Sequence, residues 1–185
     1  MTVILTQDLP AQHWGNADVT FEGLSAFIHL NASDSLRQVQ MAARKIRNQG
    51  INQVQLQGEL WSLDLQWVFA QGFATAKVGY EVLWCGDTQV QQTLKQRQEA
   101  ASFARKLIND TPEDLSPMSI ASQAAKWLKN IAGDEVSYNI IEGQELLVKK
   151  WVGIHAVGRG SERLPALLEL DFNPLATDAP VDVAL

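Results

Sequence analysis

The stretch SAFIHLNASDSLRQVQMAARKIRNQGINQVQLQ, residues 25–57, decides the fold class. Its two ends, Ser25–Leu30 and Asn52–Gln57, alternate along the chain as strands do. Between them apolar residues recur at the spacing of one helical face: Leu36, Val39, Ala43 and Ile46. A strand, a helix and a second strand in this order predict an α/β fold.

The central helix carries its own boundary signals. Ser33 or Asp34 is the expected N-cap, and Gly50 is the expected stop. Arg44, Lys45 and Arg47 lie near its C-terminal end, where positive charge suits the helix dipole.

The pattern continues on both sides of this stretch. Val3–Leu5 reads as a short strand, Ser62–Phe73 as a helix capped by Ser62, and Gly79–Trp84 as another strand. The expected buried stripe of that helix is Leu63, Trp67 and Ala70. The first 85 residues or so therefore predict a small α/β domain with short elements, rather than a complete doubly wound sheet.

The second half begins with one long helix, Thr88–Asn109, which Pro112 and Pro117 separate from the next helix, Pro117–Ile131. The expected apolar face of the next helix is Ile120, Ala124, Trp127 and Ile131, and Gly133 ends it. The expected later elements are a strand at Val136–Ile141, a short helix at Gly143–Lys150, a strand at Leu164–Phe172 and the start of another strand at Pro180–Leu185. Since the chain stops within the apolar run VDVAL, we expect it to be cut short.

Composition excludes several classes of protein. Of the 185 residues, 46% are hydrophobic and 19% are charged, which excludes disorder for most of the chain. The sequence has no apolar run of the length that spans a bilayer, and the N-terminus lacks a secretory signal. Residues 1–87 carry 5 basic and 8 acidic side chains, and residues 88–185 carry 10 and 13. Because neither half is basic, nucleic-acid binding is disfavoured.

Cysteine and histidine usage excludes two further kinds of site. Cys85 is the only cysteine, so a disulfide within the chain is impossible and a reducing cytoplasm is expected. A zinc site of the Cys/His type is excluded in practice, because His13, His29 and His155 lie far apart in the sequence.

Motifs that carry chemistry are mostly missing. The sequence has no GxxxxGK[ST], no GxSxG and no HExxH. The segment Gly158–Gly160 begins like GxGxxG, but Arg163 occupies the sixth position, so a tight turn is favoured over an anion-binding loop.

A few individual side chains are weak candidates for a functional role. For each of them we favour a purely structural role over the functional one. His155, near Ser161 and Glu162, is a candidate general base or a hydrogen-bonded histidine at a strand end. Cys85 is a candidate reactive thiol or a small buried residue. Arg159 and Arg163 are candidate carboxylate partners or solvated charges. The tryptophans are expected in the core rather than as platforms for bases: Trp14, Trp61, Trp67, Trp84, Trp127 and Trp151.

Glu169 and Asp171 are two residues apart on an expected strand and therefore share a face. Two carboxylates make at best a weak surface site for Mn²⁺. From the residues alone, the chain is an acidic α/β protein without a complete active site.

Two segments of the second half resemble the leucyl aminopeptidase family. ARKLINDTPEDLSP, residues 104–117, resembles the junction that opens the catalytic domain of that family. VGIHAVGRGSERLPALLELDFNP, residues 152–174, resembles the glycine-rich turn and strand that follow it. AARKIRNQGINQVQLQGELW, residues 42–61, and FAQGF, residues 69–73, are similar to the shorter N-terminal domain of the bacterial peptidase B branch.

The resemblance implies a cytoplasmic, hexameric exopeptidase that removes N-terminal residues from peptides. It implies two divalent metals, manganese or zinc, which polarise the scissile carbonyl and generate a hydroxide nucleophile. It also implies three parts: an N-terminal accessory α/β domain at residues 1–87, a linking helix at 88–111, and the truncated start of an α/β/α catalytic domain at 112–185.

The chain departs from the family where the chemistry begins. In the family, the strand matching APVDVAL, residues 179–185, runs into a Gly-Lys-Gly segment with a metal-binding lysine, and the carboxylate ligands and catalytic arginine follow. None of these has a matching position here, so we expect no catalytic, cofactor-binding or metal-binding residue in this chain and no activity of the chain alone. The alternatives are a non-enzymatic oligomerisation module of the aminopeptidase hexamer, and DNA binding, which the charge disfavours.

Overall fold

The computed structural model describes residues 1–8, 18–31, 34–75 and 79–173. The chain divides into two compact units, Met1–Ser102 and Phe103–Leu185. Among the described residues, no helix combines the length and apolar character needed to cross a membrane. The expected strand at Pro180–Leu185 lies outside the described residues.

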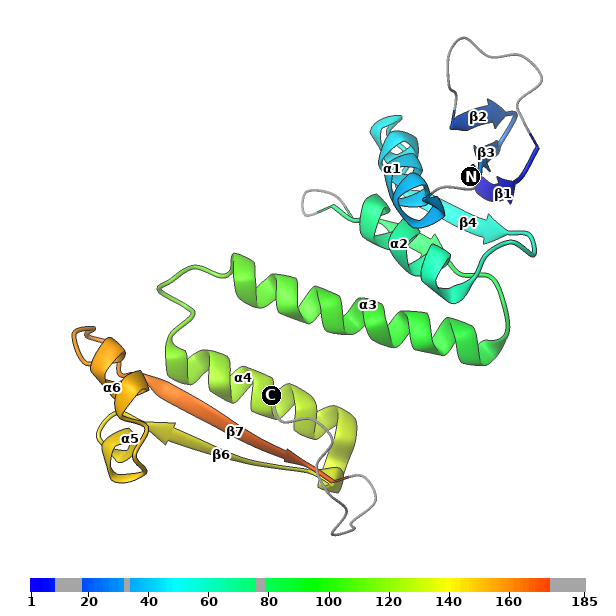
Figure 1. The fold of residues 1–185 in the computed structure, drawn as a ribbon. Coiled ribbons are helices and arrows are strands. Elements are labelled where there is room, and N and C mark those ends of the chain that lie inside the picture. The colour runs from blue at the N-terminus through cyan, green and yellow to red at the C-terminus, as the bar shows by residue number, and fades with distance from the viewer. Residues whose placement is uncertain (9–17, 32–33, 76–78, 174–185) are drawn as a thin grey trace. The chain divides into compact units, whose positions relative to one another are not determined.

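The first unit is a five-stranded sheet with the order β2-β3-β1-β4-β5 (Figure 1). Strand β1 pairs in parallel with β3 and β4, β4 pairs in parallel with β5, and only β2 is antiparallel, to β3. The strands are β1 (Thr2–Thr6), β2 (Val19–Glu22), β3 (Ser25–His29), β4 (Gln53–Gln57) and β5 (Glu81–Leu83). The helices are α1 (Ser35–Asn48), α2 (Leu63–Phe73) and α3 (Thr88–Asn109), which continues into the second unit.

The core of this unit lies on one face of the sheet. The strands bury every second residue on that face, as at Val3 and Leu5 of β1 and at Val54 and Leu56 of β4. Helices α1 and α2 supply the other side of the core: Val39, Ala42, Ala43, Ile46, Phe69 and Phe73. The central position of β1 explains why a strand of five residues is stable, because it is paired along both edges.

Helix ends follow the expected signals. The Asp34 carboxylate accepts a hydrogen bond from the Arg37 N–H at the start of α1, and the Ser62 hydroxyl accepts one from the Leu65 N–H at the start of α2. Gly50 follows α1 with a φ of +83°, a conformation that favours glycine.

Helix α2 packs closely on α1 through Gly72, a residue outside the predicted stripe of α2. A Cβ on Gly72 would lie 2.2 Å from the Gln40 carbonyl oxygen of α1, so only glycine allows this approach. The buried residues of α2 are Gln66, Phe69, Ala70, Gly72 and Phe73. Of the predicted stripe only Ala70 is fully buried, and Leu63 and Trp67 are half-buried.

The second unit contains a helix and a two-stranded antiparallel sheet, β6–β7. Its elements are α4 (Pro117–Ala132), the short 3₁₀ helix η1 (Gly133–Glu135), β6 (Val136–Glu142), α5 (Glu145–Val148), α6 (Val152–Gly158) and β7 (Ala166–Phe172). Helix α4 contacts both strands. Ser116 caps α4 through the Ser119 N–H, and Pro117 occupies its first turn.

The predicted apolar face of α4 is wrong. The helix buries Ala121 and Ala125, whereas Ile131 is 63% exposed. Trp127 stacks on Phe103, with 4.7 Å between the ring centroids. Small residues allow α4 to approach its neighbours closely, a preference that a search for large apolar residues does not detect.

The mixed α/β class is confirmed: a mostly parallel sheet with helices forms the first unit. The separate strand β2 was not expected from the sequence. The division into residues 1–87, 88–111 and 112–185 stays a prediction.

Candidate functional site

The segment from α6 to β7 holds most of the residues that the sequence singled out. His155 lies within α6, so its predicted place at a strand end is wrong. The backbone bonds of this seven-residue helix run from the His155 N–H to the Trp151 carbonyl and from the Arg159 N–H to the His155 carbonyl. An apolar run containing two glycines gave no clear periodicity from which to predict so short a helix.

The Gly158–Gly160 turn is built for packing. A Cβ added to Gly158 would lie 2.3 Å from the Cβ of Pro165, so α6 approaches the start of β7 only because residue 158 is glycine. A Cβ added to Gly160 would meet no other heavy atom within 4 Å. The tight turn favoured by the sequence therefore describes this segment better than an anion-binding loop.

Arg163 secures the turn to the start of the unit. Its guanidinium Nη1 donates a hydrogen bond to the Pro112 carbonyl. Its backbone N–H donates to the Ser161 hydroxyl at 3.1 Å, and the Ser161 N–H donates to the Gly158 carbonyl at 3.1 Å. Arg163 is exposed, as the interpretation of a solvated charge predicts, and its guanidinium binds a backbone carbonyl rather than a carboxylate.

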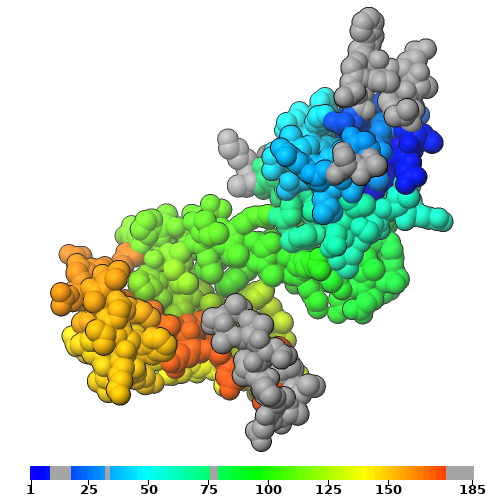
Figure 2. Space-filling model, in the orientation of Figure 1, coloured from blue at the N-terminus to red at the C-terminus, as the bar shows by residue number. Residues whose placement is uncertain are grey.

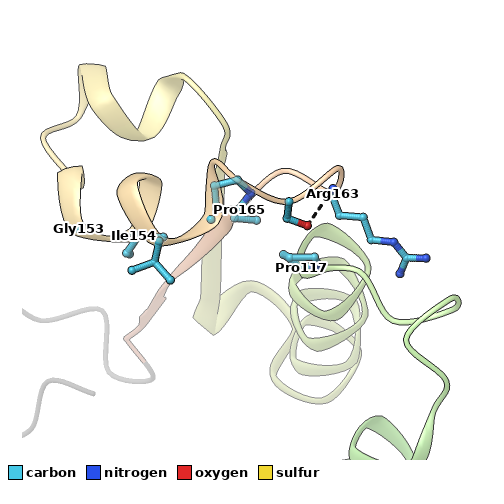
Figure 3. Close-up of a pocket in the computed structure, with 9 residues that line it drawn as sticks. Pro117, Gly153, Ile154, Arg163 and Pro165 are labelled. Carbon is cyan, nitrogen blue, oxygen red and sulfur yellow. Dashed lines mark hydrogen bonds between the residues drawn. The ribbon is translucent and has the colours of Figure 1, made fainter.

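An open pocket of about 560 Å³ lies beside this turn (Figure 3). The apolar part of its wall includes Ile154 of α6, Pro117 of α4, and Pro165, which precedes β7. The polar side chains in its lining are Ser161 and Arg163. Figure 3 shows the Arg163 guanidinium extending away from Ile154 and Gly153, so the charge is not aimed at the apolar part of the pocket. Among the described residues, the lining of the pocket includes no assembled nucleophile and base.

His155, Ser161 and Glu162 do not form a catalytic group. Ser161 and Glu162 are exposed and His155 is half-buried. The Ser161 hydroxyl accepts from the Arg163 N–H, and the described residues show no hydrogen bond between Ser161 and His155. A serine nucleophile needs a base within hydrogen-bond reach, which this arrangement does not supply.

Glu169 and Asp171 lie on one face of β7, as predicted, and both are exposed. Glu169 Oε2 accepts a hydrogen bond of 3.0 Å from Asn139 Nδ2 on the paired strand. Over the ranges that the structure describes, no three or more His, Cys, Asp or Glu side chains come together as a metal would require. This donor set does not fit a two-metal centre, in which several carboxylates must converge.

Cys85 is half-buried and packs against the core of the first unit. Burial raises the pKa of the Cys85 thiol, which opposes formation of the reactive thiolate. Its backbone is held by Gln66: the Cys85 N–H donates to Gln66 Oε1 at 3.1 Å, and Gln66 Nε2 donates to the Cys85 carbonyl at 3.2 Å. Cys85 therefore fits a small, partly buried residue better than a reactive thiol.

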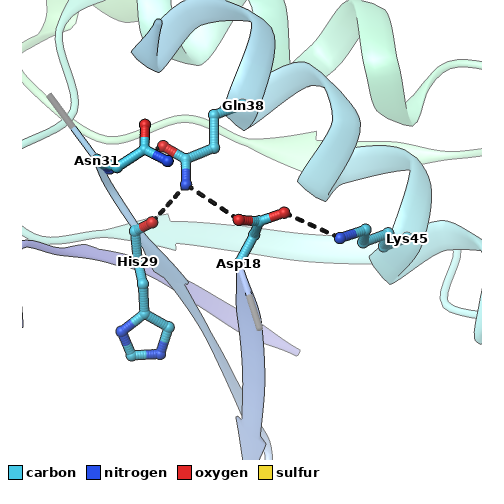
Figure 4. A network of polar contacts seen from close by, with 5 residues as sticks. All are labelled: Asp18, His29, Asn31, Gln38 and Lys45. Atoms are coloured by element: carbon cyan, nitrogen blue, oxygen red, sulfur yellow. Dashed lines mark hydrogen bonds and ion pairs between the residues drawn. The ribbon is translucent and has the colours of Figure 1, made fainter. Parts of the chain in front are cut away.

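The sequence did not point to a polar network at the end of β3 (Figure 4). Gln38 Nε2 donates to the His29 carbonyl at 2.6 Å, and Gln38 Oε1 accepts from the Asn31 N–H at 2.9 Å. Asp18 Oδ2 forms an ion pair of 3.0 Å with Lys45. Nearly all partners are backbone groups or surface charges, so the network joins β2, β3 and α1 rather than forming a ligand site. In the sequence, the feature that could have pointed to this network is Gln38, a polar residue that lies half-buried in α1.

Comparisons with known proteins give two family matches. Residues 2–88 match a family model described as "Peptidase", and residues 102–185 match that of the cytosol aminopeptidase family, catalytic domain. Over its whole length the chain is 40% identical to peptidase B of Vibrio parahaemolyticus. Over 98% of its length it is 41% identical to the putative peptidase B of Haemophilus influenzae. The chain spans 44% of the length of each of these relatives.

Solved structures show the same fold at low identity. The bottromycin maturation enzyme BotP matches 95% of this chain over 46% of its own, with a TM-score of 0.68 and 19% identity. The cytosol aminopeptidase of Coxiella burnetii matches 79% of this chain over 33% of its own, with a TM-score of 0.59 and 19% identity. The resemblance to the leucyl aminopeptidase family, and within it to the N-terminal portion of peptidase B, is confirmed.

Proposed function

We propose that this chain, a relative of peptidase B, forms the accessory domain and the beginning of the catalytic domain of a two-metal aminopeptidase. That enzyme would remove N-terminal residues from peptides, with manganese or zinc as its metals. The observation that supports this best is the collinear alignment, at 40% identity, of the whole chain with 44% of a peptidase B. The catalytic-domain match over residues 102–185 supports it from the second unit.

We propose further that the chain alone does not hydrolyse peptides. The paired carboxylates Glu169 and Asp171 are exposed on a strand, and one of them already binds Asn139. Two-metal hydrolysis needs several carboxylates around both ions and groups that stabilise the tetrahedral oxyanion. The described residues place no such groups together, so the missing ligands would come from the portion of the relatives that does not align with this sequence.

A second candidate function is that of a non-enzymatic oligomerisation module. Large apolar side chains of the second unit remain exposed, such as Phe172 at 61% and Val157 at 90%. Surfaces of this kind mark interaction sites. The partner would be a subunit of the aminopeptidase hexamer in the cytoplasm. The net charge of −6 gives no support to nucleic acid as a partner.

An aminopeptidase assay tests the main proposal. The purified 185-residue chain is incubated with peptides that begin with leucine or glutamate, in the presence of Mn²⁺ or Zn²⁺. We expect no release of the N-terminal residue. Turnover that survives repurification, and that is lost in Glu169→Ala or Asp171→Ala, would show that the chain holds a complete active site.

A further inference from the structure

Helix α1 carries most of the positive charge in the N-terminal half of the chain. Residues 1–87 contain 5 basic and 8 acidic side chains. Within α1, Ser35–Asn48, the sequence has no acidic residue. Four of the five basic residues lie on this helix: Arg37, Arg44, Lys45 and Arg47. Because the rest of this region is acidic, α1 forms a local basic surface on it.

The fold itself accounts for two of these four cations. Lys45 Nζ forms an ion pair of 3.0 Å with Asp18, which follows the network in Figure 4. Arg47 Nη1 donates a hydrogen bond of 3.2 Å to the Ala74 carbonyl, just beyond the end of α2. Lys45 and Arg47 therefore join α1 to the neighbouring elements.

Arg37 and Arg44 have no such role among the residues that the structure describes. Both are exposed, and neither forms an ion pair there. Arg44 at least lies toward the C-terminal end of α1, where the helix dipole favours a cation. Arg37 lies in the first turn, three residues after the cap Asp34, where the dipole favours an acidic residue and a capping box has Glu or Gln. The stability of the helix therefore does not explain the charge at Arg37.

Apolar side chains accompany the two arginines. Arg37, Met41 and Arg44 are spaced by four and three residues, so they share one face of α1. Met41 is 45% exposed, and so is Leu36, which precedes Arg37. Arg44 Nη1 lies 4.0 Å from Met41 Sδ, which brings a charge and a thioether together. Figure 2 shows atoms of α1, in light blue, at the surface of the first unit. We call Leu36, Arg37, Met41 and Arg44 the basic stripe.

We propose that the basic stripe docks an acidic amphipathic helix of a partner protein, a role separate from the peptidase function proposed above. Seven residues separate Arg37 from Arg44, which is about 10 Å along a helix. Two carboxylates seven residues apart on the incoming helix have the same span, so each can bind one guanidinium. An apolar residue between these carboxylates packs on Met41, whose flexible thioether adapts to the shape of its partner.

The chemistry of the stripe favours this occupant over three others. An anionic membrane requires a broad apolar face, whereas the stripe offers two half-exposed apolar side chains. Nucleic acid requires several cations along its phosphates, and only two arginines of α1 lack a structural partner among the described residues. A second copy of the chain is disfavoured because no helix that the structure describes carries two acidic residues seven positions apart.

The experiment is a binding titration of the 185-residue chain with a fluorescently labelled, synthetic helical peptide. The peptide is alanine-rich and about 20 residues long, so that it forms a helix in water. It carries two glutamates seven residues apart with a leucine between them, and in the control peptide lysine replaces both glutamates. We expect fluorescence anisotropy to show saturable binding of the glutamate peptide, weakened by salt, and no binding of the lysine peptide. Failure of the wild-type chain to bind the glutamate peptide overturns the proposal.

Charge variants locate the site. We expect Arg37→Glu and Arg44→Glu each to weaken binding at least about fivefold, because each replaces an attraction with a repulsion. The matched control is Lys95→Glu, the same change of charge at an exposed position of α3, which should alter binding less than about twofold. These side chains lie at the surface, so circular dichroism should show the same helix content in all three variants. Equal losses in all three would mean a non-specific attraction of charge and would overturn the proposal.

Further titrations test the other occupants under the same conditions. The probes are vesicles of phosphatidylcholine and phosphatidylserine, and a DNA duplex. Tighter binding of either probe than of the glutamate peptide, lost in Arg37→Glu, would overturn the assignment to an acidic helix. A dimer of the chain in sedimentation that Arg37→Glu dissociates would assign the stripe to a second copy and would also overturn the proposal.

Discussion

Gly158 and Pro165 lie so close that the size of a single methyl group decides whether α6 can pack on the start of β7. We expect Gly158→Ala to destabilise the second unit by about 1–3 kcal/mol, because its Cβ would lie 2.3 Å from that of Pro165. Amide hydrogen exchange measured on peptides of α6 and β7 reports this change separately from the first unit. Gly153→Ala is the matched control, since it lies in the same helix with open space around it, and its exchange should be unchanged or slower. Equal effects of the two substitutions would contradict the close packing.

Gln66 is the residue on which the end of β5 depends. Its side chain is 1% exposed and bonds both backbone groups of Cys85. Gln66→Leu leaves that N–H and carbonyl without partners, so we expect a loss of about 2–3 kcal/mol in the free energy of unfolding. Urea denaturation measures the loss, with Gln92→Leu on exposed α3 as the control. A Gln66→Leu variant as stable as this control would mean that the amide is dispensable.

Cys85 should react slowly at neutral pH. Burial raises the pKa of its thiol, so the folded chain holds the proton more tightly than the unfolded chain. The resulting stabilisation is present below the pKa of an ordinary thiol and is lost as the pH rises through the folded value. We expect alkylation by iodoacetamide to be slower in the folded chain than in urea at pH 7, and to accelerate in alkaline solution. Equal rates in both states at pH 7 would argue for an activated thiol.

At the scale of elements, the two sheets should differ in stability. Strand β1 is paired along both edges and contributes Val3 and Leu5 to the core, whereas β7 is paired along one edge and leaves Leu170 half exposed. We expect amide exchange in β1 and β3 to be the slowest in the chain and exchange in β6 and β7 to be markedly faster. Limited proteolysis should likewise begin between Pro112 and Leu185. Equal protection of both sheets would contradict this difference.

Helix ends were readable from the sequence because capping is a local interaction. Ser62 and Gly133 mark the start of α2 and the end of α4, and the bounds of α3 match the predicted Thr88–Asn109. These signals depend on residues within one helical turn, so no knowledge of the tertiary structure is needed.

Buried helix faces were harder to predict because they depend on what packs against the helix. Ala121 and Ala125 are buried in α4 in place of larger neighbours, and Gly72 is buried in α2. Close approach selects small side chains at these positions, whereas a periodicity of large apolar residues points to a different face. Gln66 was missed for a related reason: its partners lie 19 residues away in the chain, at Cys85.

At the scale of the whole molecule, similarity over both units supports the resemblance to the leucyl aminopeptidase family, while the side chains of the described residues supply no assembled catalytic site. Short segments at residues 104–117 and 152–174 carried the resemblance in the second unit, and the comparisons confirm it at 40% identity. The prediction that this chain has no metal-binding residue rests on the lack of positions that match the metal ligands of the family. Metal-binding experiments on the chain can test it.

Calorimetric titration of the purified chain with Mn²⁺ measures whether the chain contains a metal centre, since metal binding precedes any two-metal hydrolysis. Glu169 and Asp171 are exposed on one strand, and two carboxylates without further ligands bind such an ion weakly. We expect no saturable binding of submicromolar affinity. A two-site isotherm of submicromolar affinity, lost in a Glu169→Gln and Asp171→Asn double variant, would contradict it.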